Sequence, residues 1–181
     1  MQHTNQHTND LLLRCKNGEQ SAQFEIYKNY YRAMYNTALR ILNNSFEAED
    51  MMQESFLIAF SKLGTFKGEV TFGSWLKRIV INKCLTQLKK NNRFEEVKLE
   101  LTRKEEIEES IPDSFEMKPQ EILNTINSLK DNYRIALNLH LIEGYDYEEI
   151  SEIMNITYEN SRTTVSRAKS KLRSVLKMQL V

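Results

Sequence analysis

The sequence predicts an all-α protein made of two small helical domains joined by an acidic linker. Five glycines and two prolines in 181 residues leave few positions for hairpin turns. Apolar residues recur at steps of three and four, whereas strand-like alternation is almost absent. The apolar stripe fades over residues 93–118, where nine acids and five bases give a net charge of −4. That segment is typical of a linker between two domains.

The segment before the linker is predicted to form one domain, residues 10–92, preceded by a disordered polar tail, residues 1–9. The tail lacks the apolar stretch of a signal peptide. Asp10 is expected to open a first helix that Gly18 ends. The remaining elements, taken from apolar periodicity and turn residues, are helices over 21–42, 47–63 and 74–90, the last capped by Ser74, with a glycine-rich loop over 64–73.

The segment after the linker, residues 119–181, is predicted to form a second domain that ends in a helix-turn-helix. Pro119 starts a helical segment whose apolar stripe continues to Leu141. A short amphipathic helix follows over 147–154, and Asn155 suits the turn because it tolerates left-handed backbone. Thr157 is expected to cap the last helix, 158 to about 177.

The last helix carries a concentrated positive charge. From residue 157 to the C-terminus there are six bases and one acid, a net charge of +5 on a chain whose net charge is zero. A short helix, a tight turn and a basic second helix form the geometry that places a helix in the DNA major groove. Affinity for DNA is therefore expected from local patches rather than from the total charge.

The helix expected over 47–63 begins with four acids and has no base before Lys62. At about 100° per residue, Asp50, Gln53, Glu54 and Leu57 share one face. Two interpretations stay open. Acids near a helix N-terminus favour the macrodipole and can simply be solvated. The alternative is a docking face for a basic partner, with Leu57 as an apolar contact.

The helix expected over 74–90 has the opposite charge. Six bases and no acid lie over residues 74–93, and Arg78 and Asn82 share one face with Thr86 and Lys89. A solvated basic face is one interpretation. The other is a single-strand binding site, since the preceding loop carries Phe66 and Phe72 and aromatic rings stack on unpaired bases. Trp75 is predicted to lie in the core.

No residues are arranged for catalysis, for a metal or for a cofactor. Cys15 and Cys84 have neither metal-ligand spacing nor a disulfide framework and are interpreted as reduced thiols. His3 and His7 lie in the tail, and His140 is interpreted as structural. The sequence thus predicts a cytoplasmic protein that is not an enzyme and takes no small-molecule substrate.

Three stretches together resemble the extracytoplasmic-function (ECF) sigma factors of bacterial RNA polymerase. They are Ala48–Phe56 (AEDMMQESF), Thr65–Asn82 with its FGSWLKRI segment, and Ser166–Arg173 (SRAKSKLR). The resemblance extends from Asp10 to Leu176. It implies a transcription initiation factor that binds core polymerase, directs it to promoters through minus-10 and minus-35 recognition, and melts DNA by capturing a base.

The resemblance implies a role for each matching residue. Core polymerase would be bound through its beta-prime clamp by Asp50, Gln53, Glu54 and Phe56. The minus-10 element would be contacted by Phe66, Phe72, Lys77, Arg78 and Asn82. The minus-35 element would be contacted by Arg162, Thr163, Ser166, Arg167 and Lys171, with Arg162 as a bidentate guanine contact and Lys171 near phosphates.

The resemblance also implies partners: core polymerase through its beta-prime clamp and beta flap, promoter DNA, and an anti-sigma factor that can hold the protein at the inner membrane. Two departures concern the last helix. Ser161 is expected to weaken apolar packing, and Thr164 to remove a charge that an arginine often supplies. A conventional helix-turn-helix regulator and a helical adaptor are the alternatives, although neither accounts for all three charged segments.

Overall fold

The computed structural model describes residues 2–91 and 118–179, and every regular element in this part of the chain is a helix. The chain divides into two compact units, Met1–Gln87 and Leu88–Val181. Both units are helical, as the sequence predicted. The predicted acidic linker, apart from Lys118, lies outside the described residues.

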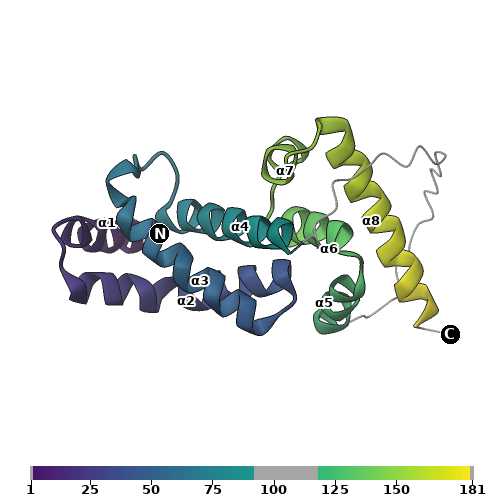
Figure 1. Cartoon of the computed structure of the whole chain (residues 1–181), viewed down its shortest axis with the longest axis horizontal. Helices are drawn as coiled ribbons and strands as arrows, with labels where there is room; N and C mark the ends of the chain where they lie inside the picture. The colour runs from purple at the N-terminus through teal and green to yellow at the C-terminus, as the bar shows by residue number, and fades with distance from the viewer. Residues whose placement is uncertain (1, 92–117, 180–181) are drawn as a thin grey trace. The chain divides into compact units, whose positions relative to one another are not determined.

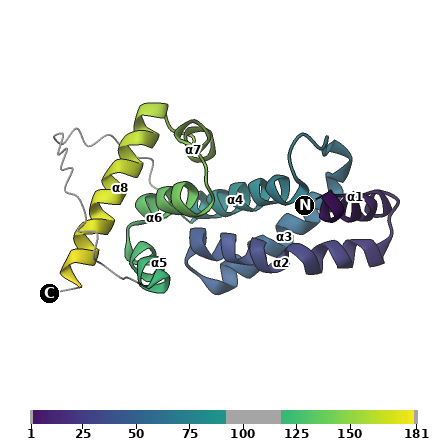
Figure 2. The ribbon, with the colours of Figure 1, turned by 180° about the vertical axis from the view of Figure 1, so that it is seen from behind.

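The first unit is built from four helices and one short 3₁₀ turn (Figure 1). In chain order they are α1 (Gln2–Lys16), α2 (Gln20–Leu42), α3 (Ser45–Ser61), the turn η1 (Leu63–Thr65) and α4 (Phe72–Lys90). Helix α2 packs against both α1 and α3, and Figure 2 shows α1 beside α2 from behind. The unit boundary falls inside α4, a few residues before the predicted domain end at 92.

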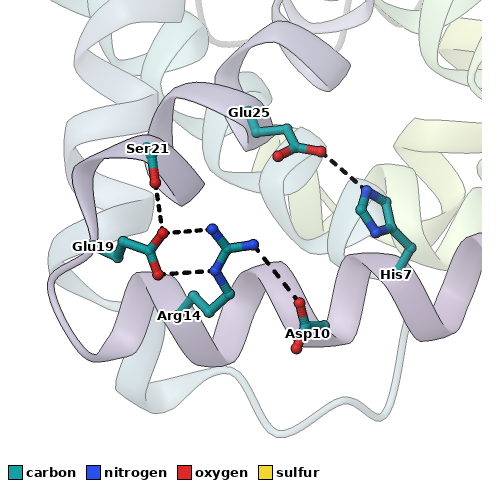
Figure 3. Close-up of polar contacts among 6 residues, drawn as sticks. All are labelled: His7, Asp10, Arg14, Glu19, Ser21 and Glu25. Atoms are coloured by element: carbon teal, nitrogen blue, oxygen red, sulfur yellow. Dashed lines mark hydrogen bonds and ion pairs between the residues drawn. The ribbon is translucent and has the colours of Figure 1, made fainter.

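Helix α1 corrects the expected disordered tail, because it begins at Gln2 rather than at Asp10. The apolar turn of Leu11 and Leu12 is buried against the rest of the unit. Once this turn is formed, each further residue that is fixed adds one hydrogen bond, whereas a new helix must fix three residues for its first bond, so the helix extends toward the N-terminus. His7 then lies 3.0 Å from the Glu25 carboxylate on α2 (Figure 3).

A polar cluster closes the turn between α1 and α2 (Figure 3). The Arg14 guanidinium donates two hydrogen bonds to the Glu19 carboxylate, one of them 2.8 Å from Nε to Oε2, and the Ser21 hydroxyl donates a third. Arg14 and Ser21 lower the pKa of Glu19 to about 2. This contribution to stability is present above the ordinary carboxyl range and is lost as pH falls toward 2.

Asparagine and threonine residues set where several helices of the first unit begin and end. Asn43 takes left-handed backbone with φ of 52°, and the Asn44 side chain accepts from the Phe46 and Glu47 backbone N–H groups, so α3 begins at Ser45. The expectation that Ser74 caps α4 is wrong. Thr71 Oγ1 accepts from the Ser74 N–H at 3.2 Å, so α4 begins earlier, at Phe72.

The second unit contains α5 (Pro119–Ser128), α6 (Asp131–Leu137) with a π-helical continuation (Asn138–Ile142), α7 (Tyr147–Met154) and α8 (Tyr158–Met178). Pro119 opens α5 as predicted, but the expected single stretch is interrupted between Ser128 and Asp131. The core joins α5, α6 and α8 through Ile126, Leu129, Leu137, Ala168 and Leu172. Within the described residues, no helix is both long and apolar enough to cross a membrane.

The predicted helix-turn-helix is confirmed. Asn155 has φ of 55° between α7 and α8, and Thr157 Oγ1 accepts from the Asn160 N–H at 3.2 Å. At the other end of α7, Asp146 and Glu149 form a reciprocal capping box, with 2.8 and 2.9 Å hydrogen bonds. Both helices of the motif therefore have fixed starting points.

Candidate docking face and nucleic-acid interface

The exposed side of α3 carries the predicted acidic face. Asp50, Gln53 and Glu54 are exposed, and Leu57 is 70% exposed. Helical spacing adds Phe46, which is 81% exposed and lies in line with Asp50, Gln53 and Leu57. The sequence pattern does not identify Phe46 as part of this face, because only the burial of the opposite side of α3 shows that the Phe46 ring is exposed.

Phe56 does not lie on this face. Its side chain is 2% exposed, and its ring packs 4.9 Å from Tyr27 on α2 and 6.1 Å from Phe60, between centroids. The expectation that Phe56 belongs to the docking surface is therefore corrected. Phe56 fixes α3 on α2 and so holds the acidic face in place from beneath.

An ion pair joins the acidic face to the neighbouring basic helix. Lys83 Nζ on α4 lies 2.5 Å from Glu54 Oε2 on α3, and both side chains are partly exposed. Because the two residues are 29 positions apart and on different helices, sequence spacing could not show this pairing. Glu54 is thus already partnered within the chain, whereas Asp50 and Gln53 lie at the centre of the exposed stripe.

Helix α4 presents the predicted basic face. Asn82 is exposed, while Lys77 and Arg78 are half-buried. Thr86 and Lys89 are exposed one and two turns beyond Asn82, and the Thr86 hydroxyl donates to the Asn82 carbonyl at 2.8 Å. The structure therefore brings Arg78 and Asn82 together on one side of α4, with long cations and a short amide available to a nucleic-acid strand.

The loop before α4 is supported by an aromatic cluster formed by Tyr30, Phe66, Phe72 and Trp75. Ring centroids lie 5.8 Å apart for Phe66 and Phe72, 5.3 Å for Phe66 and Trp75, and 5.7 Å for Phe72 and Trp75. Phe66 is half-buried, but Phe72 is only 4% exposed. Phe72 is thus a support for the loop rather than a ring open to a base. Trp75 is half-buried and is not the core residue expected.

The outer face of α8 carries most of the predicted minus-35 residues. Arg162, Thr163 and Ser166 are exposed and Arg167 is half-buried, and together they occupy one side of the helix. The Arg162 guanidinium carbon lies 6.0 Å from the centroid of the Tyr158 ring. Lys171 is exposed, but nine residues after Arg162 it is about half a turn out of phase with it.

Ser161 faces inward, at the packing position that the sequence expectation assumed, and Thr164 also faces inward. Ser161 is fully buried, and its hydroxyl lies 2.7 Å from the Tyr147 carbonyl on α7 and 2.8 Å from the Tyr158 carbonyl. It fastens α8 to α7 instead of weakening their contact. Thr164 is 4% exposed, so the charge that an arginine often supplies is missing at an inward-facing position and not on the exposed side of α8.

His140 and the two cysteines occupy structural positions. His140 stacks on Tyr147 at 5.1 Å, and its Nδ1 donates to the Tyr145 carbonyl at 3.1 Å. Burial raises the pKa of the Cys84 thiol to about 12 and also raises that of Cys15, so both are protonated at neutral pH. In the described ranges, no three His, Cys, Asp or Glu side chains are grouped so that they could hold a metal ion.

Two family models match the chain, one in each unit. The Sigma-70 region 2 model matches residues 26–94, and the Sigma-70 region 4 model matches residues 119–172. The first match contains the acidic face, the aromatic loop and the basic helix, and the second contains the helix-turn-helix. Together they span well over half of the chain. The conventional regulator considered as an alternative is not favoured, because the region 2 match accounts for the N-terminal unit.

The chain is similar to several sigma factors, and each similarity covers most of both chains. The chain is 28% identical to the ECF RNA polymerase sigma factor SigW of Bacillus subtilis, over 91% of this chain and 94% of that protein. It is 27% identical to the RNA polymerase sigma-H factor of Pseudomonas aeruginosa, over 96% and 95%, respectively. It is 26% identical to the ECF RNA polymerase sigma-E factor of Haemophilus influenzae, over 88% and 89%.

Solved structures share the fold. The sigma factor RpoE from Bartonella quintana, in complex with the anti-sigma factor NepR, has a TM-score of 0.58 at 22% identity, covering 84% of this chain and 95% of that one. CnrH in complex with the cytosolic domain of CnrY has a TM-score of 0.55 at 18% identity, covering 93% and 96%. On its sequence matches, the chain belongs to the ECF sigma factors, transcription initiation factors that bind RNA polymerase and promoter DNA.

Proposed function

We propose that the chain divides promoter recognition between its two units. The exposed stripe of α3 docks on the beta-prime clamp of core polymerase, and the loop with Phe66 captures a flipped minus-10 base while α4 holds the strand. Helix α8 reads the minus-35 element, and the second unit contacts the beta flap. The observation that carries the proposal is the separation of charge: an acidic face on α3 and basic faces on α4 and α8, each exposed.

The capture step needs no hydrolysis. A site that binds unstacked bases better than paired ones shifts the equilibrium from closed to open DNA. Phe66 is partly accessible to a base, whereas Phe72, the first residue of α4, is buried. Arg78 and Asn82 stand on the following helix as partners for the backbone and a base edge.

The docking face can be tested by reversing its central charge. Asp50→Lys should weaken binding to purified core polymerase by at least tenfold, because a basic partner would then meet a like charge. Gln53→Lys should act in the same direction. Affinity is measured by titrating labelled core polymerase without DNA, and thermal unfolding followed by circular dichroism confirms the fold.

The matched control is Glu69→Lys, which reverses an exposed acid of the same unit outside α3. It should leave core affinity unchanged. Equal losses for Asp50→Lys and Glu69→Lys would mean that only the net charge matters. Unchanged core affinity for Asp50→Lys would refute the docking face.

We also propose that an anti-sigma factor binds the chain and competes with core polymerase, keeping it in the cytoplasm or at the inner membrane. One similar solved structure is the sigma factor RpoE of Bartonella quintana in complex with the anti-sigma factor NepR. Phe24, Phe46 and Leu57 offer exposed apolar side chains in the first unit for such a partner. A candidate encoded next to this gene should displace the chain from core polymerase in a competition assay. Failure to displace would exclude that candidate.

A further inference from the structure

Gly73 lies in the first turn of α4, where glycine is less favourable than alanine. Its backbone gives no reason for glycine, because only Gly18, Gly68 and Gly144 among the described glycines have positive φ. The reason is a close approach. A Cβ added at Gly73 would lie 3.0 Å from Cε1 and 3.7 Å from Cδ1 of the Tyr30 ring, the first of these closer than carbon atoms ordinarily pack.

The ring that approaches Gly73 also touches the loop-bearing cluster. Tyr30 comes from the middle of α2, and its ring meets Phe72 edge-to-face with centroids 5.4 Å apart. Phe72 in turn meets Phe66 edge-to-face. The contacts therefore run from Tyr30 through Phe72 to Phe66. Because Gly73 has no side chain, the Tyr30 ring has room to reach the Phe72 ring.

Helix α2 is a fixed base for this chain of contacts, because the side that carries Tyr30 is buried one and two turns away in both directions, at Ala22, Ile26, Met34 and Ala38. The loop itself is exposed directly after Phe66, over residues 67–71. A loop with an exposed tip relies on its buried rings for a defined position. Part of the support of Phe66 thus comes, through Phe72, from α2, a helix that carries no DNA-binding residue predicted from the sequence.

We infer that Tyr30 is a positioning residue for base capture: its ring, admitted by Gly73, sets Phe72 and thereby the place of Phe66. The inference rests on the proposed role of Phe66 and names a residue through which that role is controlled. Tyr30 approaches Gly73 and Phe72 through its ring, and Tyr30→Phe keeps that ring.

The test uses holoenzyme assembled from core polymerase and the full chain. The probe is a single-stranded oligonucleotide carrying the minus-10 non-template strand of a promoter that the holoenzyme itself selects from genomic DNA. A second set carries one abasic site at each position in turn. For the wild type, an abasic site at the position of the captured base should lower the affinity for the oligonucleotide by about fivefold or more. This factor corresponds to the low end of the free energy of one base–aromatic stack.

Phe66→Ala should weaken binding of the intact strand by about the same factor and should add no loss at that one abasic position. Tyr30→Leu and Gly73→Ala should show the same pattern at the same position, with a smaller factor. Tyr30→Phe keeps the ring and should match the wild type. Tyr31→Leu, a matched change on α2 at a ring that stacks on Tyr27, should also match it.

The outcomes separate the inference from the proposal on which it rests. If Phe66→Ala shows no base-specific loss, the proposed capture function fails. If Phe66→Ala shows it but Tyr30→Leu and Gly73→Ala bind like the wild type, the positioning role is overturned. It is also overturned if these two variants lose the same factor on every oligonucleotide, intact or abasic. Should Tyr30→Leu unfold the chain, Gly73→Ala retains the ring and decides the question.

Discussion

Helices α4 and α8 have the same sign of charge but different surroundings. Helix α4 follows a glycine-containing loop with a buried aromatic cluster, and Lys83 on it is paired with Glu54 on α3. Helix α8 follows a tight turn, and its exposed face places short polar side chains, Thr163 and Ser166, beside Arg162. On that face the Tyr158 ring lies 6.0 Å from the Arg162 guanidinium carbon. Positive charge alone attracts any phosphate backbone, so the surroundings must specify the form of DNA that each helix suits.

Both helices begin at a threonine cap, Thr71 for α4 and Thr157 for α8, but their other supports differ. Helix α8 is positioned by directional hydrogen bonds: the Thr157 cap and the buried Ser161 hydroxyl that reaches the Tyr147 carbonyl. The loop before α4 is positioned by ring contacts, which are less directional. A rigid helix suits a duplex groove of fixed shape, whereas a loop held by rings can present one side chain to an unstacked base. The predictions below test this contrast.

The largest expected effect is on promoter melting. Phe66→Ala should reduce open-complex formation on a duplex promoter by roughly tenfold or more, since a base–aromatic stack contributes about 1–3 kcal/mol. Binding of a duplex fragment that carries only the minus-35 element should not change. Permanganate reactivity of minus-10 thymines measures the first quantity, and a gel-shift titration the second. Equal losses in both assays would remove the distinction between the two helices.

The second effect concerns sequence discrimination by α8. Arg162→Ala should relax preference at one minus-35 base by about 1–3 kcal/mol, as expected for a lost bidentate contact. Lys171→Ala is the matched control, because Lys171 is out of phase with Arg162 and should weaken all sequences uniformly. Affinities for a set of single-base minus-35 variants measure both changes. A uniform loss for Arg162→Ala would make it a phosphate contact.

The third effect is on stability. Ser161→Ala removes the buried hydroxyl between α7 and α8 and leaves the Tyr147 carbonyl with one partner fewer, so unfolding should become easier by about 1 kcal/mol. Urea denaturation followed by circular dichroism measures this. Ser170→Ala, at an exposed position of the same helix, is the control and should change little. A neutral Ser161→Ala would show that hydrogen bonding does not fix α8.

The smallest effect is expected at the bridge between α3 and α4. Glu54→Gln removes the ion pair with Lys83, and partly exposed pairs contribute about 0–1 kcal/mol, so the free energy of unfolding should fall by less than 1 kcal/mol. High salt should shrink the difference further. Urea denaturation at two salt concentrations checks this. A loss that persists at high salt would indicate a packing role for Glu54.

Local residue patterns predicted much of the fold. Periodicity located the helices to within a few residues, except at α1 and at the break between α5 and α6. Turn chemistry located Asn155 and Thr157, because left-handed backbone and a cap hydroxyl are local requirements. Charge along the chain predicted the opposite signs of α3 and α4. These features depend on residues close in sequence, so no tertiary information was needed.

Contacts between distant residues decided the rest. Phe56, Phe72 and Thr164 are buried by neighbouring helices instead of lying on the surface. Lys83 on α4 forms an ion pair with Glu54 on α3. Sequence fixes the character of a side chain, but its exposure depends on which other helix covers it. Thus the segments and charges of this sigma factor were determined by its sequence alone. The packing of the helices decided which aromatic rings are buried beneath the binding surfaces and which charged residues pair, because such contacts form only between elements distant in sequence.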